Sequence, residues 1–140
     1  MQRIRTIIWR FLSPLFLSTR DVLLDLKIIR HKGRQEYHVG WLRPDRAIRD
    51  FEKHLIKIGF GNHAAAWIDE DEILALRKLD SFRYQYHIRL YRDGEVKGHY
   101  EVTPEAGVWN HFLEWEMEPR REDFLKFVGE WITEPKPLRV

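Results

Sequence analysis

The chain has 140 residues and no cysteine, a length typical of one domain that buries its core without a disulfide. The missing cysteines exclude a disulfide framework, a cysteine-ligated zinc or iron–sulfur site and thiol catalysis, and they suit a reducing compartment, so we expect a cytoplasmic protein. The 24 Lys and Arg and the 22 Asp and Glu are unevenly placed, because residues 1–50 carry a net +6 and residues 51–140 a net −4.

Residues 1–20 are predicted to form a separate basic segment. Its apolar side chains recur at the spacing of one helical face: Ile4, Ile7, Ile8, Phe11 and Leu12. Arg10 and Pro14 interrupt the apolar run, which argues against a signal peptide or a membrane-spanning helix. We expect this segment to dock on its own domain or on a protein partner, or alternatively on an anionic membrane surface. Residues 21–134 then form a single domain, and 135–140 form a tail.

A first hairpin is predicted from two runs in which apolar and polar residues alternate. The runs cover residues 24–28 and 36–41. A tight turn at Lys32 and Gly33 would place the apolar side chains of the two runs opposite each other, so the pattern and the register agree.

A helix and a further strand are predicted next. Residues 45–58 keep helical spacing, with Phe51 and Leu55 on the apolar side. The stretch 70–79 fits both a helix and a strand, because an acidic capping pattern precedes it while its apolar residues also alternate. We predict a strand there, since it gives the sheet a continuous meander.

The clearest local pattern is a second hairpin between residues 82 and 102. Side chains alternate strictly up to residue 91, and Asp93 with Gly94 is a strong turn signal. A two-residue loop would split the apolar face between the two strands. A three-residue loop pairs Leu90 with Val96, keeps one face apolar and puts Gly94 at a left-handed position. The sequence therefore predicts the three-residue loop.

Two helices are predicted after this hairpin, over 104–117 and 121–132. The elements together predict an α+β fold, in which an antiparallel sheet of about five strands, built from two hairpins, is packed by about three helices. The predicted core consists of Tyr84, Tyr86, Ile88, Val96, Tyr100, Val39, Trp41, Phe51, Leu55, Trp109, Phe127 and Trp131.

The second hairpin also sets polar side chains beside each other on its other face. Its register predicts three cross-strand pairs: Arg89 with Lys97, His87 with His99, and Gln85 with Glu101. Two opposed imidazoles are close enough to share one ion, and two His with one carboxylate form a ligand set used by zinc and non-haem iron. We therefore predict a candidate divalent metal site at His87, His99 and Glu101, with His111 as a further ligand.

The same face allows two other interpretations. A neutral His is a general base and an Arg holds an oxyanion or a phosphate, so the catalytic candidates are His87, His99, Glu101 and Arg89. Polar side chains of a sheet are, however, most often ordinary solvated surface. The sequence contains none of the glycine-rich, nucleophile-elbow or metalloprotease motifs, and we do not expect an enzyme on this basis.

The leading functional expectation is a binding module. A basic N-terminal half attracts a polyanion such as nucleic acid, or an acidic protein partner, unless the two halves neutralise each other within the fold. The cations expected to form this interface are Lys27, Arg30, Arg34, Arg46, Arg49, Lys53 and Lys57. The alternatives are a small metal-dependent enzyme or metal-binding protein, and a structural or self-associating subunit that docks through residues 1–20. Abundant Arg and Glu beside few Asn and Gln are typical of heat-adapted proteins, although a GC-rich genome gives the same Arg bias.

Overall fold

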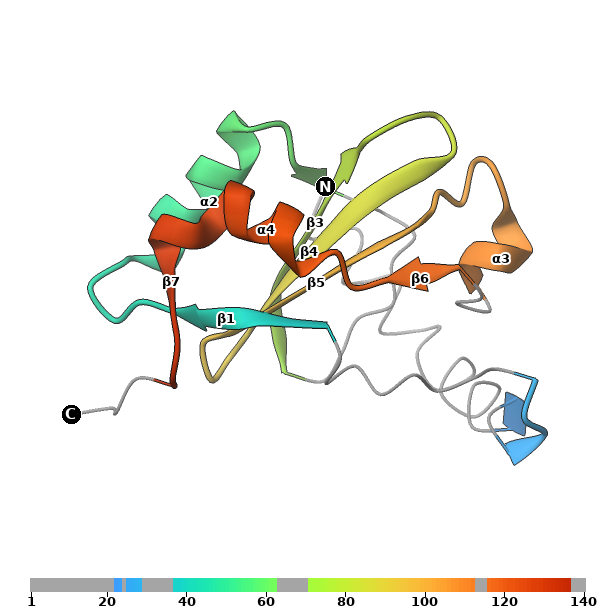
Figure 1. Ribbon diagram of the computed structural model, residues 1–140, viewed down its shortest axis with the longest axis horizontal. Helices are drawn as coiled ribbons and strands as arrows, with labels where there is room; N and C mark the ends of the chain where they lie inside the picture. The colour runs from blue at the N-terminus through green and yellow to red at the C-terminus, as the bar shows by residue number, and fades with distance from the viewer. Residues whose placement is uncertain (1–21, 24, 29–36, 63–70, 113–115, 137–140) are drawn as a thin grey trace.

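The computed structural model describes residues 22–23, 25–28, 37–62, 71–112 and 116–136. The strands of its sheet are, in chain order, β1 (His38–Leu42), β2 (Gly61–Asn62), β3 (Glu72–Leu79), β4 (Tyr84–Tyr91), β5 (Glu95–Val102), β6 (Met117–Glu118) and β7 (Ile132–Thr133). The helices are α2 (Ile48–Lys57), α3 (Val108–Phe112) and α4 (Arg121–Val128), and a 3₁₀ turn, η2 (Gly129–Trp131), follows α4. The predicted α+β fold, with an antiparallel sheet and three helices, is confirmed (Figure 1).

The centre of the sheet is a meander of β3, β4 and β5. The strand order is β2-β3-β4-β5-β1-β7, and β6 pairs with the part of β5 beyond β1. In the β4–β5 hairpin Leu90 lies opposite Val96 and Ile88 opposite Gly98, which confirms the three-residue loop. Gly94 has a φ of 91°, the left-handed position that this loop requires. The strand predicted for 70–79 is also confirmed, because β3 pairs with β4 along its length.

The first predicted hairpin is wrong in its pairing. Residues 38–41 of the predicted run 36–41 do enter a strand, but β1 has β5 on one side and β7 on the other. Val22, Leu23 and Asp25 are helical, so a strand over 24–28 does not form. The turn predicted at residues 32–33 lies outside the described residues. The alternation of apolar and polar residues correctly predicted that β1 is a strand, but alternation alone does not show which strand pairs with it.

The helices are shorter than predicted. α2 confirms the helix of 45–58 but begins at Ile48. The helix predicted over 104–117 is wrong in extent, because among its described residues, 104–112 and 116–117, α3 alone is helical, and residues 117–118 form a strand on β5. The helix predicted over 121–132 ends at Val128, and the chain then turns into β7. Within the described residues no helix has the length and apolar character needed to cross a membrane.

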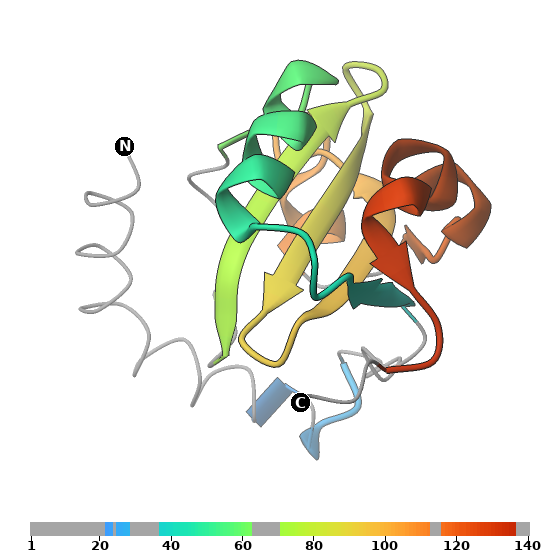
Figure 2. The same ribbon diagram turned by 90° about the vertical axis from the view of Figure 1, so that its left-hand side faces the viewer.

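The core lies between one face of the sheet and the helices α2 and α4, which lie side by side over that face (Figure 2). Phe51 and Leu55 of α2 and Phe124 of α4 are fully buried against residues of β3, β4 and β5. Most of the predicted core is buried or packed against it, but two predicted members are not core residues: Trp41 is only half-buried and lies outside the cluster, and Trp109 is 73% exposed. Helical spacing predicted that Trp109 would be buried, but α3 turns the side chain of His111 inward instead.

Candidate metal centre

The polar rows of the β4–β5 hairpin are present, but they are not solvated. His87 lies opposite His99, and Gln85 lies opposite Glu101, as the register predicted. The exposed fractions are 1% for His87, 7% for His99 and 4% for Glu101. The interpretation of this face as ordinary polar surface is therefore wrong, because polar groups that are taken out of water need partners within the fold.

Glu101 is the centre of this cluster. Its Oε1 lies 3.6 Å from Nδ1 of His87, and its Oε2 lies 3.3 Å from Nε2 of His99. One donor atom from each of the three side chains can be chosen so that all three lie within 4.8 Å of one another. The two imidazole rings face each other edge to face, with centroids 5.1 Å apart.

His111 reaches the same carboxylate from α3. Its Nδ1 lies 3.0 Å from the carbonyl oxygen of Val102 and 3.5 Å from Oε2 of Glu101, and its side chain is buried. The turn before α3 is held by the hydroxyl of Thr103, which donates to the carbonyl oxygen of Phe82 and accepts from the backbone amide of Ala106. This turn directs His111 inward and leaves Trp109 outside. The structure thus brings all four predicted metal residues to one place.

Burial and neighbouring charges set the protonation of the cluster. The pKa of His87 lies well below its usual value, first because burial disfavours the charged ring and then because the Arg89 guanidinium is nearby. Burial alone would raise the pKa of Glu101, but the positive potential of His99 and hydrogen bonds from His87 and His99 hold it well below its usual value. A neutral imidazole beside an ionised carboxylate is the state in which both groups bind a metal.

The donors lie slightly farther apart than the ligands of a bound metal. In a tetrahedral zinc site, with metal–ligand bonds of about 2.0–2.2 Å, neighbouring ligand atoms are about 3.4 Å apart. The contacts of 3.3 and 3.6 Å start from different oxygens of Glu101, Oε2 toward His99 and Oε1 toward His87, and donors chosen one from each side chain lie within 4.8 Å of one another, so the side chains would draw together around an ion. Nitrogen and oxygen donors without thiolate fit first-row transition metals better than Ca²⁺ or Mg²⁺, which take oxygen ligands.

Arg89, the fourth catalytic candidate, is bound within the fold. Its Nη1 donates to Oε2 of Glu72 at 2.9 Å, and both side chains are buried. Such a pair stabilises two buried charges against each other, because an unpaired one would be strongly destabilising. The sequence placed Arg89 next to His87 but gave no indication of Glu72, whose approach depends on the pairing of β3 with β4.

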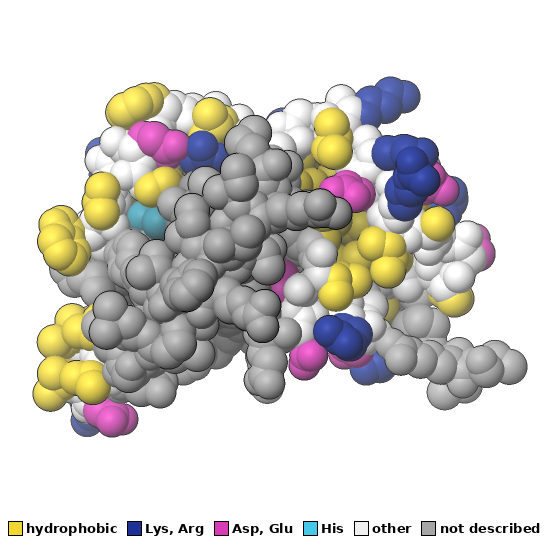
Figure 3. Space-filling view, turned by 180° about the vertical axis from the view of Figure 1, so that it is seen from behind, with side chains coloured by type: hydrophobic (Ala, Val, Ile, Leu, Met, Phe, Trp, Pro, Cys, Tyr) yellow, Lys and Arg dark blue, Asp and Glu magenta, His cyan; other side chains and the backbone are white. Residues whose placement is uncertain are grey.

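The predicted anion-binding cations are described in part. Arg46, Arg49, Lys53 and Lys57 are exposed on α2 or just before it, and Figure 3 shows Lys and Arg side chains toward the side of the molecule that carries α2. Lys27 is exposed in the turn after residue 25. Arg30 and Arg34, like the segment 1–20, lie outside the described residues.

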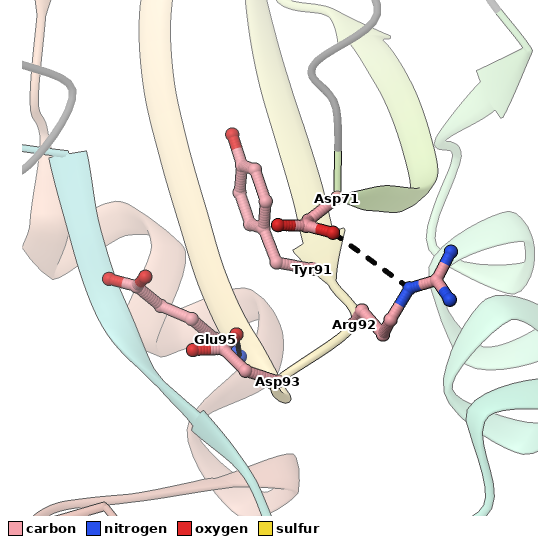
Figure 4. A pocket seen from close by; sticks show the side chains of 5 residues that line it. All are labelled: Asp71, Tyr91, Arg92, Asp93 and Glu95. Carbon is pink, nitrogen blue, oxygen red and sulfur yellow. Dashed lines mark hydrogen bonds and ion pairs between the residues drawn. The ribbon is translucent and has the colours of Figure 1, made fainter.

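A cavity of about 370 Å³ lies apart from this cluster, at the turn between β4 and β5 (Figure 4). It is lined by Asp71, Tyr91, Arg92, Asp93 and Glu95, and the sequence gave no reason to expect it. Its charged groups are engaged within the fold. Arg92 pairs with Asp71, while Asp93 and Glu95 pair with Lys136 and His38, respectively. Figure 4 shows the Arg92 and Asp71 side chains turned toward each other across the end of β4.

Comparisons with models of protein families, with curated proteins and with solved structures find no match for this chain.

Proposed function

We propose that the protein binds one divalent transition-metal ion, and zinc above all, at His87, His99 and Glu101. The observation that carries this proposal is the convergence of three buried donor side chains within 4.8 Å of one another. His111 lies against the same carboxylate, but its Nδ1, the nitrogen near Glu101, donates to the carbonyl oxygen of Val102, so we assign to His111 the orientation of Glu101 rather than a bond to the ion.

The burial of the cluster favours a structural rather than a catalytic ion. Catalytic zinc sites keep one position open to water or substrate, whereas the three donor side chains here are at most 7% exposed. His87 comes from β4, and His99 and Glu101 come from β5. An ion held by them would link the two strands, so its binding energy would contribute directly to folding.

Metal analysis of the purified full-length protein tests the proposal. We expect one equivalent of metal after loading with zinc and none in the double variant His87→Ala/His99→Ala. The matched control is His38→Ala, because His38 contacts two carboxylates, of Glu95 and Glu134, outside the cluster. Zinc at 100 times its Kd would raise the free energy of unfolding by about 2.7 kcal/mol, measured by chemical denaturation.

Two results would contradict this function. One is the absence of stoichiometric binding to the wild-type protein. The other is loss of the ion in His38→Ala together with its retention in the double variant, which would place the ion on the surface.

We propose polyanion binding as a second candidate function, on a different surface. Its support is the group of exposed cations on α2, Arg49, Lys53 and Lys57, with Arg46 just before the helix. Clustered cations that neutralise phosphates are sufficient for sequence-independent binding to nucleic acid. Electrophoretic or fluorescence titration with a mixed-sequence duplex at low salt tests this candidate.

A further inference from the structure

We infer that Gln85 is a positioning residue of the metal centre, and that Arg77 and Glu105 hold Gln85 in place. This inference rests on the metal site proposed above. It concerns three side chains to which the sequence assigned no role, although Gln85 was predicted to lie opposite Glu101.

Gln85 is completely buried between a donor and an acceptor. Its Nε2 donates to Oε1 of Glu101 at 2.8 Å, and its Oε1 accepts from Nη1 of Arg77 at 3.1 Å. A guanidinium only donates and an ionised carboxylate only accepts. The amide therefore has one allowed orientation, with its oxygen toward Arg77 and its NH₂ group toward Glu101.

This orientation fixes the carboxylate of Glu101. The hydrogen bond from Gln85 restrains Oε1, while Oε2 lies near the ring nitrogens of His99 and His111. A buried carboxylate that is held in this way cannot rotate freely, so its second oxygen stays directed at the imidazoles. Partners that orient a ligating carboxylate in this manner are a regular part of metal sites.

Arg77 connects this contact to the turn that leads into α3. Its two terminal nitrogens donate to the two carboxylate oxygens of Glu105, at 3.1 and 2.8 Å. Such a two-point pair fixes the plane of the guanidinium as well as its position. Glu105 lies two residues after Thr103, in the turn that precedes α3. This segment therefore contacts Glu101 in two ways. His111 contacts it directly, and Glu105 acts on it indirectly, through Arg77 and Gln85.

Cobalt(II) and zinc titrations of full-length variants test the inference. Gln85→Leu removes both hydrogen bonds, and Gln85→Glu keeps the shape and the contact to Arg77 but replaces the donor to Glu101 by an acceptor. We expect each to lower the metal affinity about 10- to 100-fold and to change the visible spectrum of bound cobalt. Glu122→Gln, on the exposed side of α4, is the control that keeps both properties.

The two proposals fail in different ways. If the wild-type protein binds no metal, the proposed function is wrong and the inference falls with it. If the wild-type protein binds metal and either folded Gln85 variant binds within twofold of it with an unchanged cobalt spectrum, the metal site stands and the role of Gln85 is overturned. Circular dichroism of the metal-free variants establishes which of them fold, and Gln85→Glu keeps the test decisive if Gln85→Leu does not.

Discussion

The hydroxyl of Tyr100 shows how a single residue is tuned by its neighbours. The side chain is buried in the core, and its hydroxyl donates to Oδ2 of Asp80 at 2.7 Å. Burial and then the hydrogen bond and negative charge of Asp80 raise the pKa of Tyr100 to about 12, although the Arg120 guanidinium over the ring acts in the opposite direction. Both main causes disfavour the phenolate, so the neutral hydroxyl is strongly preferred in the folded state.

We therefore predict that one tyrosine of the folded protein ionises near pH 12 rather than near the usual value of 10. Since the folded pKa is raised, Tyr100 contributes its stabilisation fully below pH 10, and the contribution is lost as the pH rises toward 12. Ultraviolet absorbance of the phenolate measures the titration. The phase near pH 12 should be lost in Tyr100→Phe but kept in Tyr86→Phe, which removes another tyrosine whose pKa is raised, and a wild-type titration that finishes near pH 10 would show that the Asp80 contact does not act in this way.

At the scale of elements, β5 and α4 approach each other closely at Gly98. A Cβ atom at Gly98 would lie 2.6–2.7 Å from three ring atoms of Phe124, which is fully buried. We predict that Gly98→Ala lowers the free energy of unfolding by about 1–3 kcal/mol, because a tightly packed ring cannot move aside without cost. Denaturant titration measures the loss. Gly61→Ala in β2 is the matched control, since a Cβ there meets no atom within 4 Å, and equal losses in the two variants would refute the close packing.

The turn between β4 and β5 gives a second prediction at this scale. Gly94 has a left-handed backbone, while a Cβ at this position would meet no other atom, so any cost of substitution is conformational. We expect Gly94→Ala to destabilise the protein by about 1–2 kcal/mol and Gly94→Asn to cost less, because Asn tolerates this conformation. Thermal unfolding of the two variants gives the comparison. A smaller loss for Ala than for Asn would mean that the hairpin adopts another loop.

The elements also show what the sequence could and could not predict. The register of β4 with β5 was predictable, because a slip by one residue would split the apolar face at Leu90 and Ile88. The partners of β1 were not predictable, because alternation over 36–41 is satisfied equally by a local hairpin and by pairing with β5 and β7. α3 was misjudged for a related reason. Its spacing favoured Trp109 as the buried side chain, whereas the hydrogen bond from His111 to Val102 turns the helix the other way.

The same reasoning applies to the candidate site. Pairing rules placed His87 beside His99 and Gln85 beside Glu101, and the structure has both pairs. Period two shows which side chains share a face but not whether that face is covered. The burial of the cluster, and the approach of His111 and Arg77 to it, depend on contacts between elements that are distant in sequence.

At the scale of the whole molecule, the uneven charge of the chain survives folding. Among the described residues, Arg43 forms an ion pair with Asp45 and Lys53 forms one with Asp50, so both acidic partners belong to the basic half. Among the described residues of the basic half, His38 contacts two carboxylates of the acidic half, those of Glu95 and Glu134. Within the described part of the chain, the ion pairs of the α2 cations therefore do not involve the acidic half, and this supports the proposal that an external anion binds there.

This charge distribution allows a quantitative prediction for the second candidate function, the binding of a polyanion. If α2 contacts duplex DNA, the logarithm of the binding constant falls linearly with the logarithm of the salt concentration, by about 0.9 for each phosphate that a cation neutralises. We predict that Lys53→Gln/Lys57→Gln reduces this slope by about 2 and weakens binding uniformly across sequences, because contacts to phosphates carry no base specificity. Lys126→Gln on α4 is the matched control for the loss of a surface charge outside α2, since Lys126 and Lys53 each pair with an Asp three residues earlier on their own helix. Binding that is absent at low salt, or that does not change with salt, would remove nucleic acid as a ligand of this surface and leave the metal centre as the proposed function.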